Sequence, residues 1–231
     1  MKAMVSAYVS TCDVCQRVKV EHLPKPGLLQ SIPIPQEAWE VITMDFIEGL
    51  PQSKKANCIL VIIDKFTKYA YFLPLFHPYT AMEVARMYLD QVYKLHGQPK
   101  VAISDRDRTF TSHFWREFML QLGTTTLFST TYHPKTDGQS ERLNQCLEHY
   151  LRSMCFLKPS TWANWLSQAE WWYNTTYHTS LGTTPFEALY GYKPPLYDWS
   201  YTSVNNTIQE LNENRQTLAK LLKDQLEKAT N

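Results

Sequence analysis

Three acidic residues, Asp45, Asp105 and Glu141, occupy positions where a carboxylate is not an ordinary surface charge. Asp45 interrupts the apolar run at 41–47, and Asp105 directly follows the short apolar stretch at 101–103. Glu141 opens a helical pattern, and 35 residues separate it from Asp105. Three anions gathered in a fold core repel one another unless a cation lies between them. The combination indicates a divalent-metal site, and such sites commonly support phosphoryl transfer.

Each carboxylate also has a structural explanation when it is considered alone. Asp105 could begin a turn, and the helix macrodipole favours Glu141 in a first helical turn whatever its function. Asp45 is harder to explain, because strands disfavour Asp and burying a lone charge is costly. Asp64 also follows an apolar strand, but the Lys-Phe-Thr-Lys turn after it gives it a structural role. Ligation by Asp45, Asp105 and Glu141 through oxygen alone suits Mg²⁺ or Mn²⁺ rather than zinc.

The bulk composition limits the class of protein without choosing a function. The 231 residues fit one domain of ordinary size with extensions. A hydrophobic fraction of 44% and an aromatic fraction of 13% exclude a disordered chain. We find no signal-peptide pattern, no membrane-length apolar stretch, no Gly-rich phosphate loop and no G-x-S-x-G elbow. The net charge of only +1 means that any DNA affinity must come from local patches or from flanking parts.

The chain has five cysteines, and this odd number with a single close pair indicates a reducing compartment. Cys12 and Cys15 have the two-residue gap of half a tetrahedral zinc site. His22 is the one histidine near them, so a complete set of zinc ligands is missing. A pair of reduced thiols at the surface is the alternative. Residues 23–27, Leu-Pro-Lys-Pro-Gly, break any helix and indicate a linker.

Hydrophobic periodicity predicts an α/β fold, a mixed five-stranded sheet flanked by helices. Three strands are expected within 39–49 and 57–75, and two short strands at 99–104 and 124–128. The expected helices are 80–96, 111–122, 138–156, 161–178 and a short one from Pro185 to about Gly191. Residues 203–230 are polar and helix-prone, which predicts a helical tail.

The helix expected at 138–156 matters most, because it carries Glu141. Thr136 or Asp137 is its expected amino-terminal cap, with Gln139 completing a capping box behind Thr136. Glu141 lies well away from the apolar stripe of this helix. That stripe is formed by Leu143, Leu147, Tyr150, Leu151 and Met154.

Four strings of the chain match one known family in the right order. The string from Tyr132 to Arg142 contains Glu141 and looks like a catalytic-helix signature; the others are 44–46, 104–107 with 110–112, and 184–191. Together they resemble the integrases of gypsy-type LTR retrotransposons, which have a retroviral-type catalytic core. The likeness runs from about Cys12 to Pro195 and covers most of the chain.

The resemblance implies an RNase H-like core with a D,D-35-E triad of Asp45, Asp105 and Glu141 on two Mg²⁺ or Mn²⁺ ions. Asp45 and Asp105 would hold one ion, and Asp45 and Glu141 the other. One ion would activate the incoming oxygen and the other would stabilise the leaving 3′ oxygen. The implied reactions are trimming of the element's DNA ends by water and joining of the resulting 3′-hydroxyl to target DNA. DNA is the implied partner. The implied protein is a homo-oligomer that acts in the nucleus and has no membrane partner.

The resemblance also points to supporting residues around the triad. Asn144, one helical turn after Glu141, matches a family position near the metal and the DNA end, although core or capping duty explains it equally well. Lys135, Gln139 and Arg142 would contact the DNA end or its phosphates. The tryptophans between 162 and 172 are interpreted as packing groups of the core or of a dimer.

The predicted domains are a zinc-module remnant at 1–26, the catalytic core at 36–195 and the helical extension at 196–231. The family's His pair before Cys12 and Cys15 and its carboxy-terminal DNA-binding module have no counterpart here. We therefore expect a fragment, a truncated product, or a decayed or repurposed copy, in which zinc binding is doubtful. The alternative function is a catalytically silent or domesticated module that binds DNA or dimerises. A nuclease acting on RNA–DNA hybrids is a third hypothesis, which the acidic spacing and the catalytic-helix string disfavour.

Overall fold

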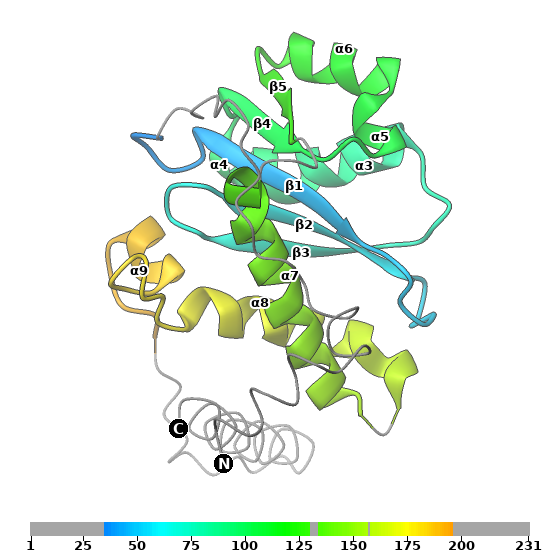
Figure 1. The fold of residues 1–231 in the computed structure, drawn as a ribbon, viewed down its shortest axis with the longest axis vertical. Helices are drawn as coiled ribbons and strands as arrows, with labels where there is room; N and C mark the ends of the chain where they lie inside the picture. Colours follow the sequence, from blue (N-terminus) through cyan, green and yellow to red (C-terminus); the bar gives the residue numbers. More distant parts are fainter. Residues whose placement is uncertain (1–34, 130–133, 157, 196–231) are drawn as a thin grey trace, which may run out of the picture.

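The computed structural model describes residues 35–129, 134–156 and 158–195, with the backbone but not the side chains of 134–141. A five-stranded sheet in the order β3-β2-β1-β4-β5 forms its centre (Figure 1). The first three strands are antiparallel neighbours, whereas β4 runs parallel to β1 and β5 parallel to β4. The strands are β1 (Val41–Ile47), β2 (Cys58–Asp64), β3 (Ala70–Leu75), β4 (Val101–Ser104) and β5 (Thr125–Phe128). The mixed five-stranded sheet expected from the sequence is confirmed.

Helices cover both faces of this sheet (Figure 1). The long helix α7 and helix α8 pack on one face, and α3 with its continuation packs on the other. No helix among the described residues is long and apolar enough to cross a membrane. The helices are α3 (Ala81–Tyr88), a π-turn (Leu89–Tyr93), α4 (Lys94–His96), α5 (Arg108–Thr111), α6 (His113–Gln121), α7 (Pro134–Met154), a 3-10 helix (Pro159–Asn164), α8 (Leu166–Thr175) and α9 (Pro185–Tyr190).

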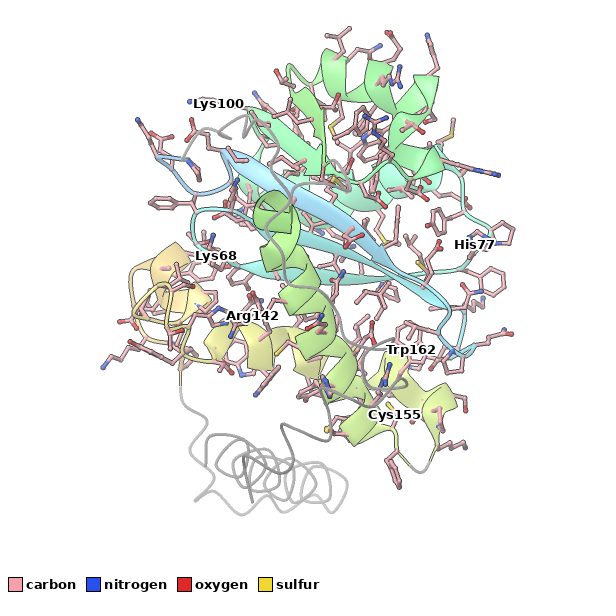
Figure 2. The ribbon with its side chains drawn as sticks, in the orientation of Figure 1. Lys68, His77, Lys100, Arg142, Cys155 and Trp162 are labelled. Atoms are coloured by element: carbon pink, nitrogen blue, oxygen red, sulfur yellow. The ribbon has the colours of Figure 1, made fainter. Side chains whose placement is uncertain are left out.

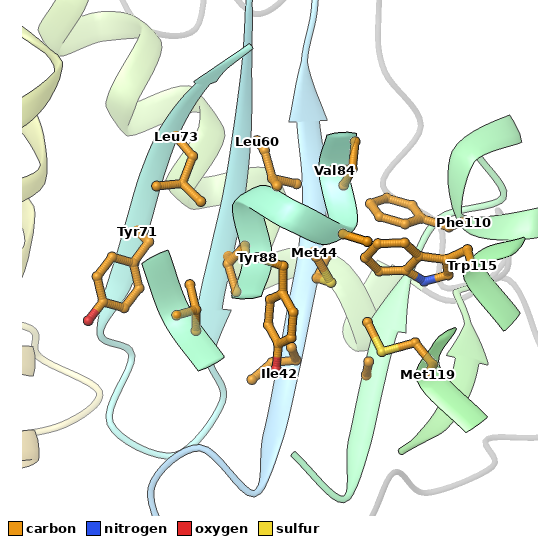
Figure 3. Close-up of a cluster of buried hydrophobic side chains, with 14 of the residues drawn as sticks. Ile42, Met44, Leu60, Tyr71, Leu73, Val84, Tyr88, Phe110, Trp115 and Met119 are labelled. Carbon is orange, nitrogen blue, oxygen red and sulfur yellow. The ribbon is translucent and has the colours of Figure 1, made fainter. Parts of the chain in front are cut away.

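Two apolar clusters hold the layers together, one on each face of the sheet. All seven residues of β2 are buried, as expected for a strand covered on both sides. On one face, Met44 of β1 packs with Tyr88 of α3 and Trp115 of α6 (Figure 3). On the other face, the expected stripe of α7 is confirmed: Leu143 and Leu147 are buried against β1, β2 and β3. The stripe fixes which side of α7 faces the sheet.

Several helix boundaries differ from those expected. The helix expected at 111–122 is α6, which begins after Ser112, whose backbone is extended and whose Oγ accepts the backbone N–H of Trp115. The short helix α5 directly before it was not expected. The helix expected at 161–178 is a 3-10 helix followed by α8. The cap expected at Thr136 or Asp137 is wrong: α7 begins earlier, at Pro134, and both residues lie inside the helix. Proline is favoured in the first helical turn, where its missing N–H costs nothing.

Helix α8 covers the free edge of β3 with two polar side chains. Asn174 accepts the N–H of Ala70 at 2.9 Å and donates to its carbonyl oxygen at 2.8 Å. Glu170 accepts the N–H of Phe72 at 2.7 Å. Burial raises the pKa of Glu170 to about 7, against the smaller opposing effect of that hydrogen bond. The sheet edge is therefore closed by side chains instead of another strand.

Glu170→Gln is expected to stabilise the fold at pH 8. With its folded pKa near 7 and an ordinary value of 4.5, Glu170 binds more protons in the folded state between these pH values. The wild type therefore loses stability as pH rises through this window, by on the order of 3 kcal/mol. The amide introduced by the substitution can still accept the N–H of Phe72 but has no charge to bury. Urea unfolding at pH 4 and pH 8 measures the difference.

The matched control is Glu117→Gln on α6, where the side chain is exposed. It should shift the free energy of unfolding equally at both pH values. An equal shift for Glu170→Gln would contradict the account of this buried carboxylate.

Candidate metal centre

Asp45, inside β1, and Asp105, directly after β4, lie side by side where the ladder between these two parallel strands ends. The last pair of the ladder is Met44 opposite Ser104, so the two aspartates are the next residues along the chain. Neighbouring strands lie about 4.8 Å apart, which sets the separation of the two backbones. Both side chains are half-buried. The strand ends thus bring together two of the three acidic residues singled out in the sequence.

The Asp45 carboxylate is held by two donors. Its Oδ1 accepts the backbone N–H of Phe46 at 2.8 Å, and its Oδ2 accepts Nδ2 of Asn144 at 2.7 Å. Asn144 belongs to α7, so this bond ties the helix to β1 across 99 residues of sequence. The Asn144 Oδ1 is buried and accepts no hydrogen bond from the described residues. The bond places Asn144 beside Asp45 and at the same time holds α7 against β1, so both explanations given for Asn144 remain open.

Asp105 shapes the turn that follows β4. Its Oδ1 accepts the backbone N–H of Asp107 at 3.1 Å, and Asp107 in turn caps α5 by accepting the N–H of Thr109 at 2.7 Å. The turn role that was one explanation for Asp105 in the sequence is therefore observed. The turn uses one carboxylate oxygen of Asp105 as an acceptor, and Asp105 still lies beside Asp45.

The backbone of residue 141 lies in α7, one turn before Asn144. The side chains of Glu141, Lys135 and Gln139 lie outside the described residues, so their predicted roles stay predictions. Arg142 is described and is exposed on α7 (Figure 2). The candidate zinc ligands Cys12 and Cys15 also lie outside the described residues, as do the predicted segments 1–26 and 196–231.

The donor set at this strand end fits a hard divalent cation. Asp45 and Asp105 supply carboxylate oxygens, and the Asn144 Oδ1 is a buried acceptor without a donor among the described residues. Oxygen donors of this kind suit Mg²⁺ or Mn²⁺. Among the residues whose side chains are described, no cluster of three or more His, Cys, Asp or Glu could hold a metal ion. The family resemblance assigns the third carboxylate to Glu141, whose side chain lies outside the described residues.

Glu48 and Asp107 place negative charge close to Cys58 and Tyr79. Burial and the nearby Glu48 carboxylate raise the pKa of the Cys58 thiol to about 12. Burial also raises the pKa of Tyr79, whose hydroxyl donates to Glu48 Oε1 at 3.0 Å. Asp107 contributes in the same direction to both groups.

Two features outside the candidate site have a structural explanation or no predicted role. Asp64 is fully buried and accepts the N–H of Trp39 and both the N–H and hydroxyl of Thr67, so it closes the β2–β3 turn. Further along α7, a cavity of about 380 Å³ lies between Leu50 and Trp162, with Glu148 and Arg152 at its wall. Sequence reasoning missed this cavity, because its walls come from segments about 100 residues apart.

Trp162 is buried, as predicted for a packing group, whereas Trp171 keeps 48% of its surface exposed.

Comparison with known proteins gives one consistent result. Residues 35–134 match the family described as the integrase core domain. The Tf2-3 and Tf2-4 transposon polyproteins of Schizosaccharomyces pombe (strain 972 / ATCC 24843) are each 36% identical over 210 residues. The match covers 91% of this chain and 16% of each polyprotein, so the chain spans about one sixth of these relatives.

Solved structures share the fold at lower sequence identity. A chain of the simian T-cell lymphotropic virus intasome in complex with PP2A regulatory subunit B56 gamma gives a TM-score of 0.61 at 18% identity, covering 89% of this chain and 73% of that one. The HTLV-2 integrase catalytic core domain, solved with magnesium, gives 0.53 at 20% identity, covering 66% and 97%. These likenesses confirm the predicted RNase H-like fold class.

Asn144→Ala is expected to lower the free energy of unfolding by about 2 kcal/mol, because it removes a hydrogen bond to a charged carboxylate. Gln145→Ala, at the exposed neighbouring position of α7, is the control and should change it by less than about 0.5 kcal/mol. Urea denaturation of both variants without added metal measures the difference. Equal losses would mean that the bond to Asp45 contributes nothing to docking α7.

Proposed function

We propose that this chain, which carries an integrase core domain of the retroviral type, catalyses metal-dependent trimming of DNA 3′ ends and their joining to target DNA. The observation that carries the proposal is the meeting of Asp45, Asp105 and α7 at one end of the sheet. The Asn144–Asp45 bond holds against β1 the same helix that bears residue 141 one turn earlier.

In this proposal Asp45, Asp105 and Glu141 are the metal ligands and the catalytic residues. Two divalent cations, when bound, would activate the attacking oxygen and stabilise the leaving 3′ oxygen of an in-line displacement. Asn144 would hold the Asp45 carboxylate in one orientation and keep α7 in register with β1. Magnesium is supported by the oxygen donor set and by its presence with the HTLV-2 catalytic core domain.

The partners are part of the proposal. DNA ends and target DNA are the proposed substrates, since the chain is similar to a chain of a viral intasome. A homo-oligomer is proposed because the HTLV-2 catalytic core domain is described in dimeric and trimeric forms. The nucleus is the proposed site of action, because the target DNA lies there. Because the chain spans about one sixth of its polyprotein relatives, further modules of a longer protein would supply DNA affinity.

Substitution of the proposed ligands is expected to abolish strand joining. Asp45→Asn, Asp105→Asn and Glu141→Gln should each reduce Mn²⁺-dependent joining, or disintegration of a branched DNA substrate, by more than about 100-fold. The reason is the loss of a charged oxygen donor with little change in shape. Asp90→Asn, at an exposed position of the π-turn, is the control and should retain activity.

Strand joining by the Asp105→Asn variant at the wild-type level would refute the assignment of Asp105 as a metal ligand. If Mg²⁺ or Mn²⁺ binding does not depend on Asp45, Asp105 and Glu141, either alone or with DNA, the catalytically silent module is favoured. Cleavage of an RNA–DNA hybrid without strand joining would favour a plain nuclease.

DNA binding is expected to be modest and to weaken with salt. Arg142 is exposed on α7, within the predicted DNA-contact set, so Arg142→Ala should reduce the slope of log K against log salt by about 0.9. Arg152 lies on the same helix but forms an ion pair with Glu148 at 2.9 Å, so Arg152→Ala should leave the slope almost unchanged. Fluorescence anisotropy over a range of salt concentrations measures both. A tight, salt-insensitive complex would contradict this interpretation of the surface.

A further inference from the structure

The backbone hydrogen bonds that hold β1 beside β4 stop just before the two aspartates. The last paired residues are Met44 and Ser104. Beyond them, β1 continues only with β2, where Phe46 lies opposite Leu60. The chain after Ser104 instead turns away through Asp107 into α5. The strand ladder therefore brings Asp45 and Asp105 together but does not hold the segments that follow them.

Side chains from those two segments meet on the opposite face of the sheet. Phe46 follows Asp45, and alternate residues of a strand point to opposite faces. Asp45 accordingly contacts Asn144 of α7, whereas Phe46 packs in the cluster formed with α3 and α6. Phe110, in α5 after Asp105, is 1% exposed and lies in the same cluster (Figure 3).

The rings of Phe46 and Phe110 stack face to face, with centroids 4.9 Å apart and planes 11° apart. Tyr79, from the segment after β3, lies on Phe46 at 4.9 Å and 31°, and its hydroxyl donates to Glu48. Trp115 packs its ring edge against Phe110 at 5.3 Å and 64°. We call Tyr79, Phe46 and Phe110 the ring stack. It joins three segments that no backbone ladder joins at this point.

Ordinary core packing would also bury these rings, but it does not require this arrangement. Phe46 is half-buried and Tyr79 is half-buried, so the stack reaches the surface at the site end of β1. A flat ring pair resists sliding and tilting in a way that flexible aliphatic side chains do not, and it contributes about 0.5–1.5 kcal/mol beyond area burial. A metal centre made by two backbone segments needs that kind of constraint.

We infer that the ring stack positions Asp45 and Asp105 relative to each other for cation binding, with Phe46 and Phe110 as positioning residues. Phe46 transmits the constraint through the adjacent backbone, whose N–H donates to Asp45 Oδ1. Phe110 transmits it through the α5 turn, whose N–H groups bind Asp107 and Asp105. The inference rests on the proposed function, since it concerns the same two carboxylates.

The test is the Mn²⁺ affinity of the whole chain, measured by calorimetry without DNA. Phe46→Leu and Phe110→Leu keep apolar side chains but remove the flat stacked pair, and each should weaken Mn²⁺ binding about tenfold. Phe46→Tyr keeps the ring and should stay within about twofold of wild type. Phe118→Leu is the matched control, because Phe118 belongs to the same cluster and makes ring contacts with Tyr88, Phe114 and Trp115.

Thermal melting accompanies each measurement, so that variants are compared as folded proteins. If Phe110→Leu does not fold, Phe46→Leu at its half-buried position carries the test together with its Tyr counterpart. Unchanged affinity in Phe46→Leu, or an equal loss in Phe118→Leu, would overturn the positioning role while leaving the proposed function intact. Wild-type protein that shows no Mn²⁺ binding dependent on Asp45 and Asp105, either alone or with DNA, would remove both the positioning role and the proposed function.

Discussion

The pairing of β1 with β4 as parallel neighbours is the constraint on which the candidate site depends. It places two sequence positions 60 residues apart, Asp45 and Asp105, side by side where the ladder ends at Met44 and Ser104. If β1 and β4 were antiparallel, the residue that follows β4 would lie at the opposite end of the strands from Asp45. The other interactions described at the site either orient these two carboxylates or add an oxygen donor beside them.

The site is costly to assemble without a cation. Two carboxylates are half-buried together where the β1–β4 ladder ends. Donation from Asn144 and from the N–H groups of Phe46 and Asp107 offsets part of this repulsion. The same donors orient the oxygens, so a cation would meet a prepared arrangement. The fold thus fixes the positions of the carboxylate oxygens, and the negative charge of these carboxylates would attract a cation.

Sequence reasoning was reliable where one short pattern determines the structure. The apolar run of β2 and the stripe containing Leu143 and Leu147 predicted their elements, because burial follows directly from spacing. The start of α7 was not predicted, because Thr136 and Asp137 are good caps and Gly138 is a poor helix former, yet the helix continues through them from Pro134.

Contacts between distant segments were beyond the sequence. Glu170 accepts from Phe72 across 98 residues, and the ring stack joins three segments through side-chain faces. Neither leaves a periodic signal. The position of Asn144 beside Asp45 was suggested by its spacing from Glu141 and by the family resemblance, but its hydrogen bond needed coordinates.

Anomalous diffraction from crystals soaked with Mn²⁺ tests most directly whether Asp45, Asp105 and Glu141 hold two divalent cations. Two manganese peaks are expected where the β1–β4 ladder ends, each within coordination distance of the Asp45 carboxylate, one shared with Asp105 and the other with Glu141. Peaks remote from these residues, or a Glu141 side chain directed away from Asp45 in the soaked crystal, would contradict it.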